Sequence, residues 1–456
     1  MIIQELKIRN LYGFLNRDIK FKNAISILVG INGSGKTSVL NIINWLLRPN
    51  ITELCTIEFE SIILKFKYLD DHYILTALQN EVELTLDLEN STKKIDFNQI
   101  QATFRIHPKH FTKNENLKET ISGHYENLGP EEKERKTWNF LFNEIPKPIV
   151  IGLDRYLYTE EGDDFRFQSE YNSNDSKRLL RKKNTLTPLE NVQSILTREY
   201  NSFRNKILQL NKSLNEKIIL SSFNKIFTDE NLSDLLNEKK PSVEIVNKLN
   251  KQVTDFLSDN KVSTNTINLE IEKVNNYFTS LKTILKKSNN SKELDLPYLI
   301  NISQFKKINE LIVEFSEFEI ATKNEYSQLN EFLDIINSFF SDSAKQLYFD
   351  KETSQVKFNI LNKRGDVIDE NREIKYLSSG EKQILILLTY IKYNKNLNVF
   401  IIDEPELSLH PKWQSDFLEM VKKIMPKNSQ LILATHSPEI IADNRSSCTI
   451  LLPYNN

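Results

Sequence analysis

The sequence predicts an α/β fold, in which both ends of the chain build one head and a helical insertion separates them. A strand, a glycine-rich loop and a helix follow one another over residues 25–47. Short apolar runs typical of strands recur in the N-terminal part and again over residues 399–435. Between residues 160 and 342, glycine disappears after Gly162 and long helical patterns dominate. These observations predict two α/β lobes that come together from distant parts of the chain.

The glycine-rich loop is Gly30–Thr37, which fits the pattern G-x-x-x-x-G-K-[ST] at every fixed position. An apolar run, 24–29, precedes it and a helical pattern, 38–47, follows it, which is the context of a phosphate site. Glycines let backbone N–H groups turn towards phosphates, and the next helix points its positive end at them. Lys36 adds a positive charge, and the Thr37 hydroxyl is expected to bind Mg²⁺. The residues expected to bind the nucleotide phosphates are Asn32, Gly33, Ser34, Gly35, Lys36, Thr37 and Ser38.

The composition excludes several classes of protein. A chain of 456 residues exceeds one comfortable core, so two or three structural units are expected. The net charge of -2 gives no global attraction to nucleic acids or membranes. Two cysteines cannot form a disulfide framework, and the N-terminus has no signal-type segment. The longest apolar run, 384–391, is too short to span a bilayer, so we expect a soluble, cytoplasmic protein.

Residues 1–158 form the expected N-terminal lobe. Residues 2–8 and 18–21 have the pattern of half-buried strands. Further strand-like runs between residues 57 and 106 predict an antiparallel meander beside the phosphate loop. The apolar run 147–153 predicts a buried strand that returns to the central sheet.

Residues 159–342 form the expected helical insertion. Helical patterns run from about residue 188 to 223 and from about residue 303 to 340. The insertion either covers the head as a bundle or forms an arm for dimerisation or partner binding, because apolar periodicity does not separate these alternatives. The segment 177–183 carries five positive charges. It is expected to be a solvated surface, with a contact to DNA or to an acidic partner as the alternative.

Residues 343–456 form the expected C-terminal lobe. Strand-like runs at 346–349 and 356–361 return the chain to the head. Residues 377–383 then open a helix, for which Ser378 is the expected N-cap.

Polar residues follow two apolar strands of this lobe. Asp403 and Glu404 come directly after the run 399–402. Asp403 is placed to hold Mg²⁺ together with Thr37, and Glu404 to polarise an attacking water as general base. His436 ends another apolar strand and is expected to hydrogen-bond the terminal phosphate and the water. The candidate catalytic residues are Lys36, Glu404 and His436.

The ordered set of motifs resembles ABC-type ATPases of the SMC and RecF kind. The matching motifs are Walker A at 30–37, the signature at 377–381, Walker B at 399–404, the D-loop at 407–410 and the switch histidine at 436. The resemblance implies an ABC-type P-loop ATPase head with an antiparallel β subdomain and a helical insertion. The signature departs from L-S-G-G-Q, because Ser379 replaces the first glycine and Glu381 the glutamine. Such variants are familiar among SMC-like and defence-associated ATPases.

In this family two heads face each other, and the signature of one covers ATP held by the other. The resemblance therefore implies ATP and Mg²⁺ as cofactors and a head-to-head dimer or a higher oligomer. The residues that it implies at the ATP of a second copy are Ser378, Ser379, Gly380 and Glu381. The Q-loop glutamine stays open between Gln99 and Gln101, and adenine contacts are expected near residues 12–17.

The segment D-E-P-E-L-S-L-H-P-x-W-Q at 403–414 is similar to bacterial anti-phage defence ATPases, first those of Septu (PtuA) and next those of PARIS (AriA). This resemblance implies an ATPase that assembles with and regulates a nuclease supplied in trans, either an HNH nuclease like PtuB or a Toprim-like nuclease. Little chain follows the last expected strand at 447–452, so we expect no C-terminal Toprim domain. Direct DNA binding stays open, and no membrane partner is expected.

Two other functions stay open. A RecF/SMC-like ATPase of DNA repair or maintenance would itself bind DNA in an ATP-dependent way. A nucleotide-binding scaffold would bind ATP with negligible turnover. A transporter subunit is disfavoured by the long insertion.

Overall fold

The computed structural model describes residues 1–113, 123–125, 128–151, 157–158, 187–223, 241–259, 264–288, 296–393 and 399–452. The chain divides into two compact units. Residues 1–198 and 332–456 form the first unit, and residues 199–331 form the second. The first unit holds all strands of the described residues together with several helices, which confirms the predicted α/β head.

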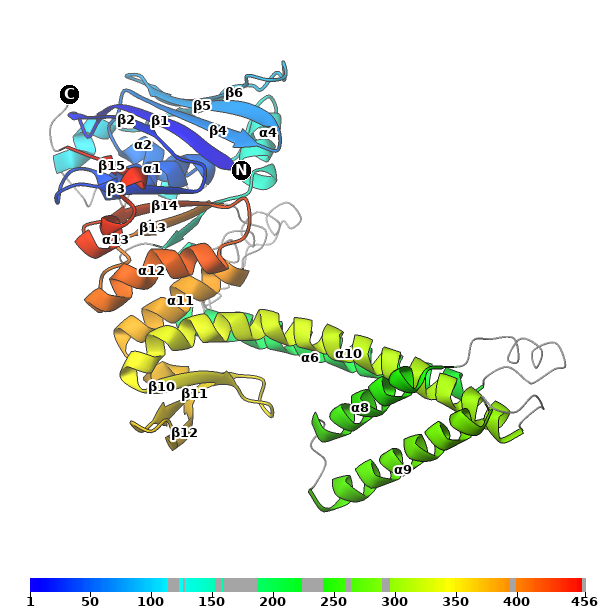
Figure 1. Cartoon of the computed structure of the whole chain (residues 1–456). Helices are drawn as coiled ribbons and strands as arrows, with labels where there is room; N and C mark the ends of the chain where they lie inside the picture. The colour runs from blue at the N-terminus through cyan, green and yellow to red at the C-terminus, as the bar shows by residue number, and fades with distance from the viewer. Residues whose placement is uncertain are drawn as a thin grey trace, which may run out of the picture. The chain divides into compact units, whose positions relative to one another are not determined.

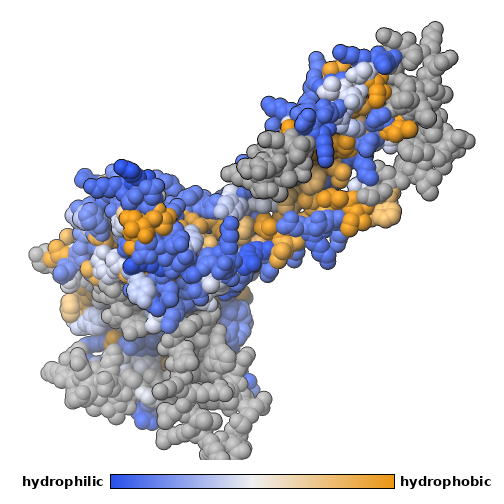
Figure 2. Space-filling view, turned by 90° about the horizontal axis from the view of Figure 1, so that it is seen from below, coloured by the Kyte–Doolittle hydropathy of each residue, from blue (hydrophilic) through white to orange (hydrophobic). Residues whose placement is uncertain are grey.

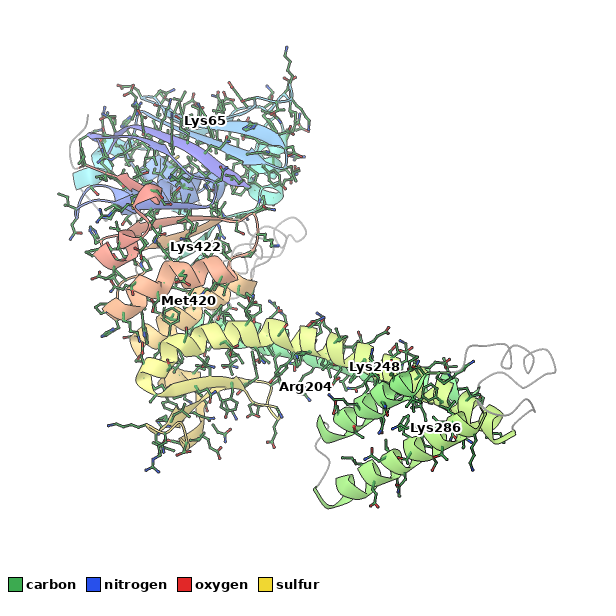
Figure 3. The ribbon with its side chains drawn as sticks, viewed as in Figure 1. Lys65, Arg204, Lys248, Lys286, Met420 and Lys422 are labelled. Atoms are coloured by element: carbon green, nitrogen blue, oxygen red, sulfur yellow. The ribbon has the colours of Figure 1, made fainter. Side chains whose placement is uncertain are left out.

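A six-stranded antiparallel sheet, here called sheet A, contains most of the N-terminal strands (Figure 1). Its strands in spatial order are β2 (Leu15–Lys20), β1 (Ile2–Leu11), β4 (Ser61–Tyr68), β5 (Asp71–Gln79), β6 (Glu83–Asn90) and β7 (Ile100–Thr103). Buried and more exposed side chains alternate along these strands, so one face packs on the core. The other face carries charged side chains such as Lys65 (Figure 3), whose ammonium pairs with Glu5 at 2.8 Å. The predicted antiparallel meander is confirmed.

A second sheet of six strands, sheet B, is parallel except at one edge. Its strands in spatial order are β15 (Cys448–Ile450), β3 (Ile25–Val29), β14 (Gln430–Thr435), β13 (Val399–Asp403), β8 (Ile149–Ile151) and β9 (Leu157–Tyr158). Only β9 pairs antiparallel with its neighbour. The register places Asp403 beside Ala434, and Ala434 beside Leu28. The carboxyl ends of β3, β14 and β13 therefore meet at one edge of the sheet, where open α/β sheets bind ligands.

Helices cover both faces of sheet B. One hydrophobic cluster joins sheet A, α1 (Lys36–Leu47), α2 (Ile51–Thr56) and one face of sheet B, so these two helices lie between the sheets. The helices α11 (Ser379–Tyr393) and α12 (Pro411–Ile424) cover the opposite face (Figure 1). Because both faces are covered, β13 and β14 are buried along their whole length and read as continuous apolar runs.

A third sheet, sheet C, has three antiparallel strands: β10 (Lys345–Phe349), β11 (Val356–Leu361) and β12 (Val367–Glu373). The first two confirm the predicted strands. The third was not expected, because nearly all of its side chains are exposed and its sequence shows no apolar alternation. The short helices of the first unit are η1 (Pro108–Lys113), α4 (Arg135–Asn139), η2 (Phe140–Glu144), η4 (Ser341–Ser343), η5 (Ile374–Tyr376), α13 (Pro438–Ala442) and η6 (Arg445–Ser447).

Long helices form the second unit, which confirms a helical insertion. They are α8 (Val243–Asp259), α9 (Thr264–Ser288) and the greater parts of α6 (Pro188–Ser222) and α10 (Leu296–Phe340), whose remaining turns belong to the first unit. Lys206 pairs with Glu325 at 2.8 Å and Lys217 pairs with Glu314, so α6 and α10 run antiparallel. An apolar cluster joins α8, α9 and α10.

The second unit also exposes apolar side chains. Figure 2 shows hydrophobic residues among the hydrophilic ones on its surface, and those more than half exposed include Leu208, Ile219, Leu220 and Ile320. Basic side chains such as Arg204, Lys248 and Lys286 lie on its helices (Figure 3). Within the described ranges, no helix combines the length and the apolar character needed to cross a bilayer.

Gln430 joins sheets A and B. Its side chain is fully buried at the start of β14. Its Oε1 accepts from the Ile3 N–H at 2.8 Å, and its Nε2 donates to the carbonyl oxygens of Ile3 and Lys22 at 2.8 Å each. A polar residue stands in this apolar strand because three backbone groups of the N-terminal segment depend on it.

Replacing Gln430 by Leu removes these bonds and leaves buried backbone groups without partners. We expect the Gln430→Leu substitution to lower the free energy of unfolding by about 3 kcal/mol. Urea unfolding of the full chain measures this loss. As control, Gln346→Leu changes an exposed glutamine of β10 and should shift the free energy of unfolding by no more than about 0.5 kcal/mol. Equal losses in the two variants would contradict the role of Gln430.

Candidate nucleotide-binding site

The phosphate loop, Gly30–Thr37, joins β3 to α1. Gly33 and Gly35 have φ angles of 80° and 88°, which other residues rarely adopt. A Cβ at Gly30 would lie 2.6 Å from the carbonyl oxygen of Leu451. The glycine pattern in the sequence therefore follows from the backbone path of the loop and from its close contact with the C-terminal segment.

Arg17 holds the outer side of this loop. Its Nη2 donates to the carbonyl oxygens of Ser34 at 2.9 Å and Leu452 at 2.7 Å. Burial of the guanidinium lowers the pKa of Arg17. Sequence reasoning placed adenine contacts among residues 12–17, and Phe14 in that segment is 61% exposed. The adenine contacts stay a prediction. No pattern in the sequence predicted the hydrogen bond from Arg17 to the phosphate loop.

Lys36 lies at the centre of the site. Its Nζ is 2.6 Å from Nε2 of His436. Burial lowers the pKa of the Lys36 ammonium, and three nearby carboxylates oppose this shift. They belong to Glu404, Asp403 and Glu406. The loop therefore carries a desolvated positive charge at the position where phosphates would bind.

Asp403 ends β13 and is 7% exposed. Burial raises the pKa of its carboxyl, and a side-chain hydrogen bond with Thr37 opposes the shift. Its Oδ1 is buried and has no hydrogen-bond partner among the described residues. Mg²⁺ prefers oxygen ligands and takes one or two protein carboxylates together with substrate phosphates. Thr37 and Asp403 therefore fit the predicted metal ligands.

Glu404 and His436 stand at the carboxyl ends of neighbouring strands. Glu404 has a φ of 48°, a left-handed conformation that is rare outside glycine, and its N–H donates to Ala434 O at 2.9 Å. Its Oε1 lies 3.6 Å from His436 Nε2. The backbone N–H of His436 donates to Glu406 Oε1 at 2.5 Å. The turn that breaks the strand thus aims Glu404 at the histidine, and Glu406 holds the histidine backbone.

The structure therefore brings together Lys36, Thr37, Asp403, Glu404 and His436. Lys36 and His436 are 400 positions apart in the sequence. Their chemical roles stay predictions, but their proximity is a property of the fold.

The signature segment lies at the start of α11. The Ser378 N–H donates to Glu381 Oε2 at 2.7 Å, and the Glu381 N–H donates to Ser378 Oγ at 3.4 Å. This reciprocal pair is a capping box, which confirms the predicted N-cap. The Glu381 carboxylate also accepts hydrogen bonds from Ser343 and Lys345. It is therefore fully engaged within its own chain.

The signature segment also packs on the D-loop of its own chain. A Cβ at Gly380 would lie 2.4 Å from the carbonyl oxygen of Ser408, so only glycine allows this contact. Gln383 Nε2 donates to the carbonyl oxygen of Pro405 at 3.1 Å. Gln383, two residues after the signature, thus contacts the residue that follows Walker B, and sequence reasoning did not single it out.

The two candidates for the Q-loop glutamine lie close together at one end of sheet A. Gln99 and Gln101 are exposed at the β7 edge of sheet A, where Gln101 Nε2 donates to Gln99 Oε1 at 3.3 Å. The carboxyl end of β8 lies at the same edge of sheet B as Asp403, because β8 and β13 are parallel. Residues 152–156, which follow β8, lie outside the described residues. The basic segment 177–183 also lies outside them.

The motif residues converge at one edge of sheet B, and a family comparison identifies the class of protein. The chain matches the family described as AAA ATPase domain over residues 1–441. It belongs to this AAA ATPase domain family.

Two curated proteins are similar to parts of this chain. The probable ATPase of retron Ec83 from Escherichia coli is 28% identical over 196 residues, which are 38% of this chain and 34% of that protein. The Septu protein PtuA from Bacillus thuringiensis is 31% identical over 108 residues, which are 24% of each chain. The chain thus spans about a third of the first relative and about a quarter of the second.

One similar solved structure is the Smc head domain with an extended coiled coil, bound to the C-terminal domain of ScpA, derived from Pyrococcus furiosus. The match covers 97% of this chain and 91% of the Smc chain. Its sequence identity is 15% and its TM-score is 0.36.

The Lys36→Ala substitution tests the ATPase site directly. It removes the ammonium that lies in the phosphate loop, so we expect ATP affinity to fall by about 100-fold. Titration with a fluorescent ATP analogue measures this change. Lys427→Ala, an exposed lysine before β14, serves as control and should leave affinity unchanged. Retained ATP affinity in Lys36→Ala would refute the assignment of the loop.

Proposed function

We propose that this chain binds and hydrolyses ATP with Mg²⁺ between two copies of its head, and that it regulates a nuclease in cytoplasmic anti-phage defence. The observation that carries the ATPase part is the convergence of Lys36, Asp403, Glu404 and His436 in a member of the AAA ATPase domain family. The defence part rests on the similarity to the probable ATPase of a retron and to the Septu protein PtuA.

The chain's own residues have distinct roles in this proposal. The phosphate loop and Lys36 bind the phosphates of ATP. Thr37 and Asp403 would hold Mg²⁺, which neutralises charge on the phosphate oxygens when it is bound. Glu404 accepts a proton from the attacking water, whose oxygen bonds to the γ-phosphorus as the bond to the β–γ bridging oxygen breaks. His436 hydrogen-bonds the terminal phosphate and orients the water.

A second copy completes the site. In this proposal the signature residues Ser378, Ser379 and Gly380 contact the ATP of the facing head. Their place at a helix start supports this role, because a helix N-terminus favours anions. The tight contact of Gly380 with the D-loop supports it further, since it leaves the segment well defined before any partner arrives.

Glu404→Gln tests whether the site hydrolyses ATP. The amide cannot accept the proton, so we expect turnover to fall by about 10²–10⁴-fold, with ATP affinity close to that of the wild type. Phosphate release and nucleotide titration measure the two quantities. Glu419→Gln, on the exposed face of α12, should behave like the wild type. Equal, near-zero turnover in wild type and Glu404→Gln would favour a nucleotide-binding scaffold instead.

Co-purification tests the defence part. We expect the chain, when it is expressed with its genomic neighbours, to elute with a nuclease in a complex of defined stoichiometry, which native mass measurement determines. The chain alone should show no ATP-dependent DNA binding. ATP-dependent DNA binding without any bound nuclease would instead support an ATPase of DNA repair or maintenance.

A further inference from the structure

Glu381 occupies the position of the glutamine in L-S-G-G-Q, and its side chain is turned into its own head. It is 2% exposed. Oε1 accepts from Ser343 Oγ at 2.7 Å and from Lys345 Nζ at 2.9 Å. Oε2 accepts from Lys345 Nζ at 2.8 Å and from the Ser378 N–H at 2.7 Å. Four hydrogen bonds thus engage both oxygens, and the carboxylate has no surface left for a nucleotide of another copy.

The charge of Glu381 depends on Lys345. Burial by itself would raise the pKa of the Glu381 carboxyl, but hydrogen bonds from Lys345, Ser343 and Ser378 outweigh burial and lower it. The carboxylate is therefore ionised, and the Lys345 side chain, 19% exposed, is its counter-ion. Removal of one partner of a buried pair leaves an uncompensated charge, which is strongly unfavourable.

Three of these four hydrogen bonds come from Ser343 and Lys345. Both residues lie in a short stretch of chain, residues 342–345, which we call the root segment. It covers the end of η4, the short helix after α10, and the first residue of β10. Its first residue, Asp342, accepts from Lys412 Nζ at 2.6 Å and from Trp413 Nε1 at 3.1 Å. The root segment therefore binds both the signature helix α11 and the first turn of α12, which follows the D-loop.

We propose that Lys345 and Ser343 are positioning residues for ATP turnover. They hold the Glu381 carboxylate, and Glu381 in turn fixes the backbone of Ser378, so that the signature segment is set for the ATP of a second copy. In this arrangement Glu381 makes no contact with ATP. The inference rests on the proposed head-to-head site and deepens it.

Three variants test the proposal. Lys345→Met leaves the buried Glu381 carboxylate without a counter-ion and displaces the signature segment, so we expect kcat to fall by about 10–100-fold. The affinity of the chain's own phosphate loop for ATP should stay unchanged. Lys345→Met/Glu381→Gln removes both charges and keeps a glutamine that can close the capping box, so kcat should recover to within about threefold of the wild type. Lys423→Met, which breaks an exposed ion pair of α12, should change nothing.

Two outcomes would overturn the proposal. One is wild-type kcat in Lys345→Met, and the other is a folded double variant that stays as slow as Lys345→Met, which would mean that the Glu381 charge acts on ATP directly. If Lys345→Met fails to fold, as shown by its Tm, Ser343→Ala replaces it, because this variant removes one uncharged bond and should lower kcat by about two- to fivefold. Unchanged kcat in Ser343→Ala would then overturn the proposal.

A second measurement separates this proposal from the proposed hydrolysis. ATP-dependent self-association, followed by sedimentation in the Glu404→Gln background, reports on the signature contact without turnover. We expect Lys345→Met to weaken self-association and Lys345→Met/Glu381→Gln to restore it. If the wild type does not hydrolyse ATP but this pattern holds, the proposed hydrolysis is refuted, while the role of Lys345 in setting the signature segment for the ATP of a second copy stands. If ATP induces no self-association, the positioning role is refuted.

Discussion

A parallel sheet brings the carboxyl ends of its strands to one edge, and in this chain that edge collects opposite charges around Lys36. The ammonium is desolvated and lies 2.6 Å from His436 Nε2, while nearby carboxylates oppose the loss of its proton. Asp403 is desolvated too, and its Oδ1 has no partner among the described residues. A buried cation and a buried carboxylate with spare bonding capacity suit a ligand that brings both an anion and a metal ion. This balance of charges is the condition that magnesium-bound ATP would satisfy.

Sequence reasoning succeeded where one local pattern determines one local structure. The phosphate loop was predictable, because backbone angles such as the φ of 88° at Gly35 require glycine. The strands that lead to Asp403 and His436 were predictable, because buried parallel strands have continuous apolar sequences that end in polar residues. The Ser378 cap was predictable because a capping box depends on two residues three positions apart.

Sequence reasoning failed where a residue acts through distant contacts. Arg17 donates a hydrogen bond to the carbonyl oxygen of Leu452, 435 positions away, and no local sequence pattern predicts such a contact. Strand β12 (Val367–Glu373) is held by pairing with β11 and buries almost no side chain, so it lacks the apolar alternation that marks a strand. The hydrogen bonds of Glu381 were not predicted either, because its partners Ser343 and Lys345 lie 38 and 36 positions earlier in the sequence.

The contacts of Glu381 also explain why this signature ends in glutamate. A glutamine there could still cap the helix, but it would leave the Lys345 ammonium, 19% exposed, without its counter-ion. Glutamate satisfies the cap and the charge together, and a negative charge in the first turn of α11 is favoured by the helix dipole. The Glu381 carboxylate then depends on the position of the root segment, since any displacement of Lys345 would leave this buried carboxylate without its counter-ion. Glutamate at position 381 thus matches a lysine at the start of β10 in the same unit.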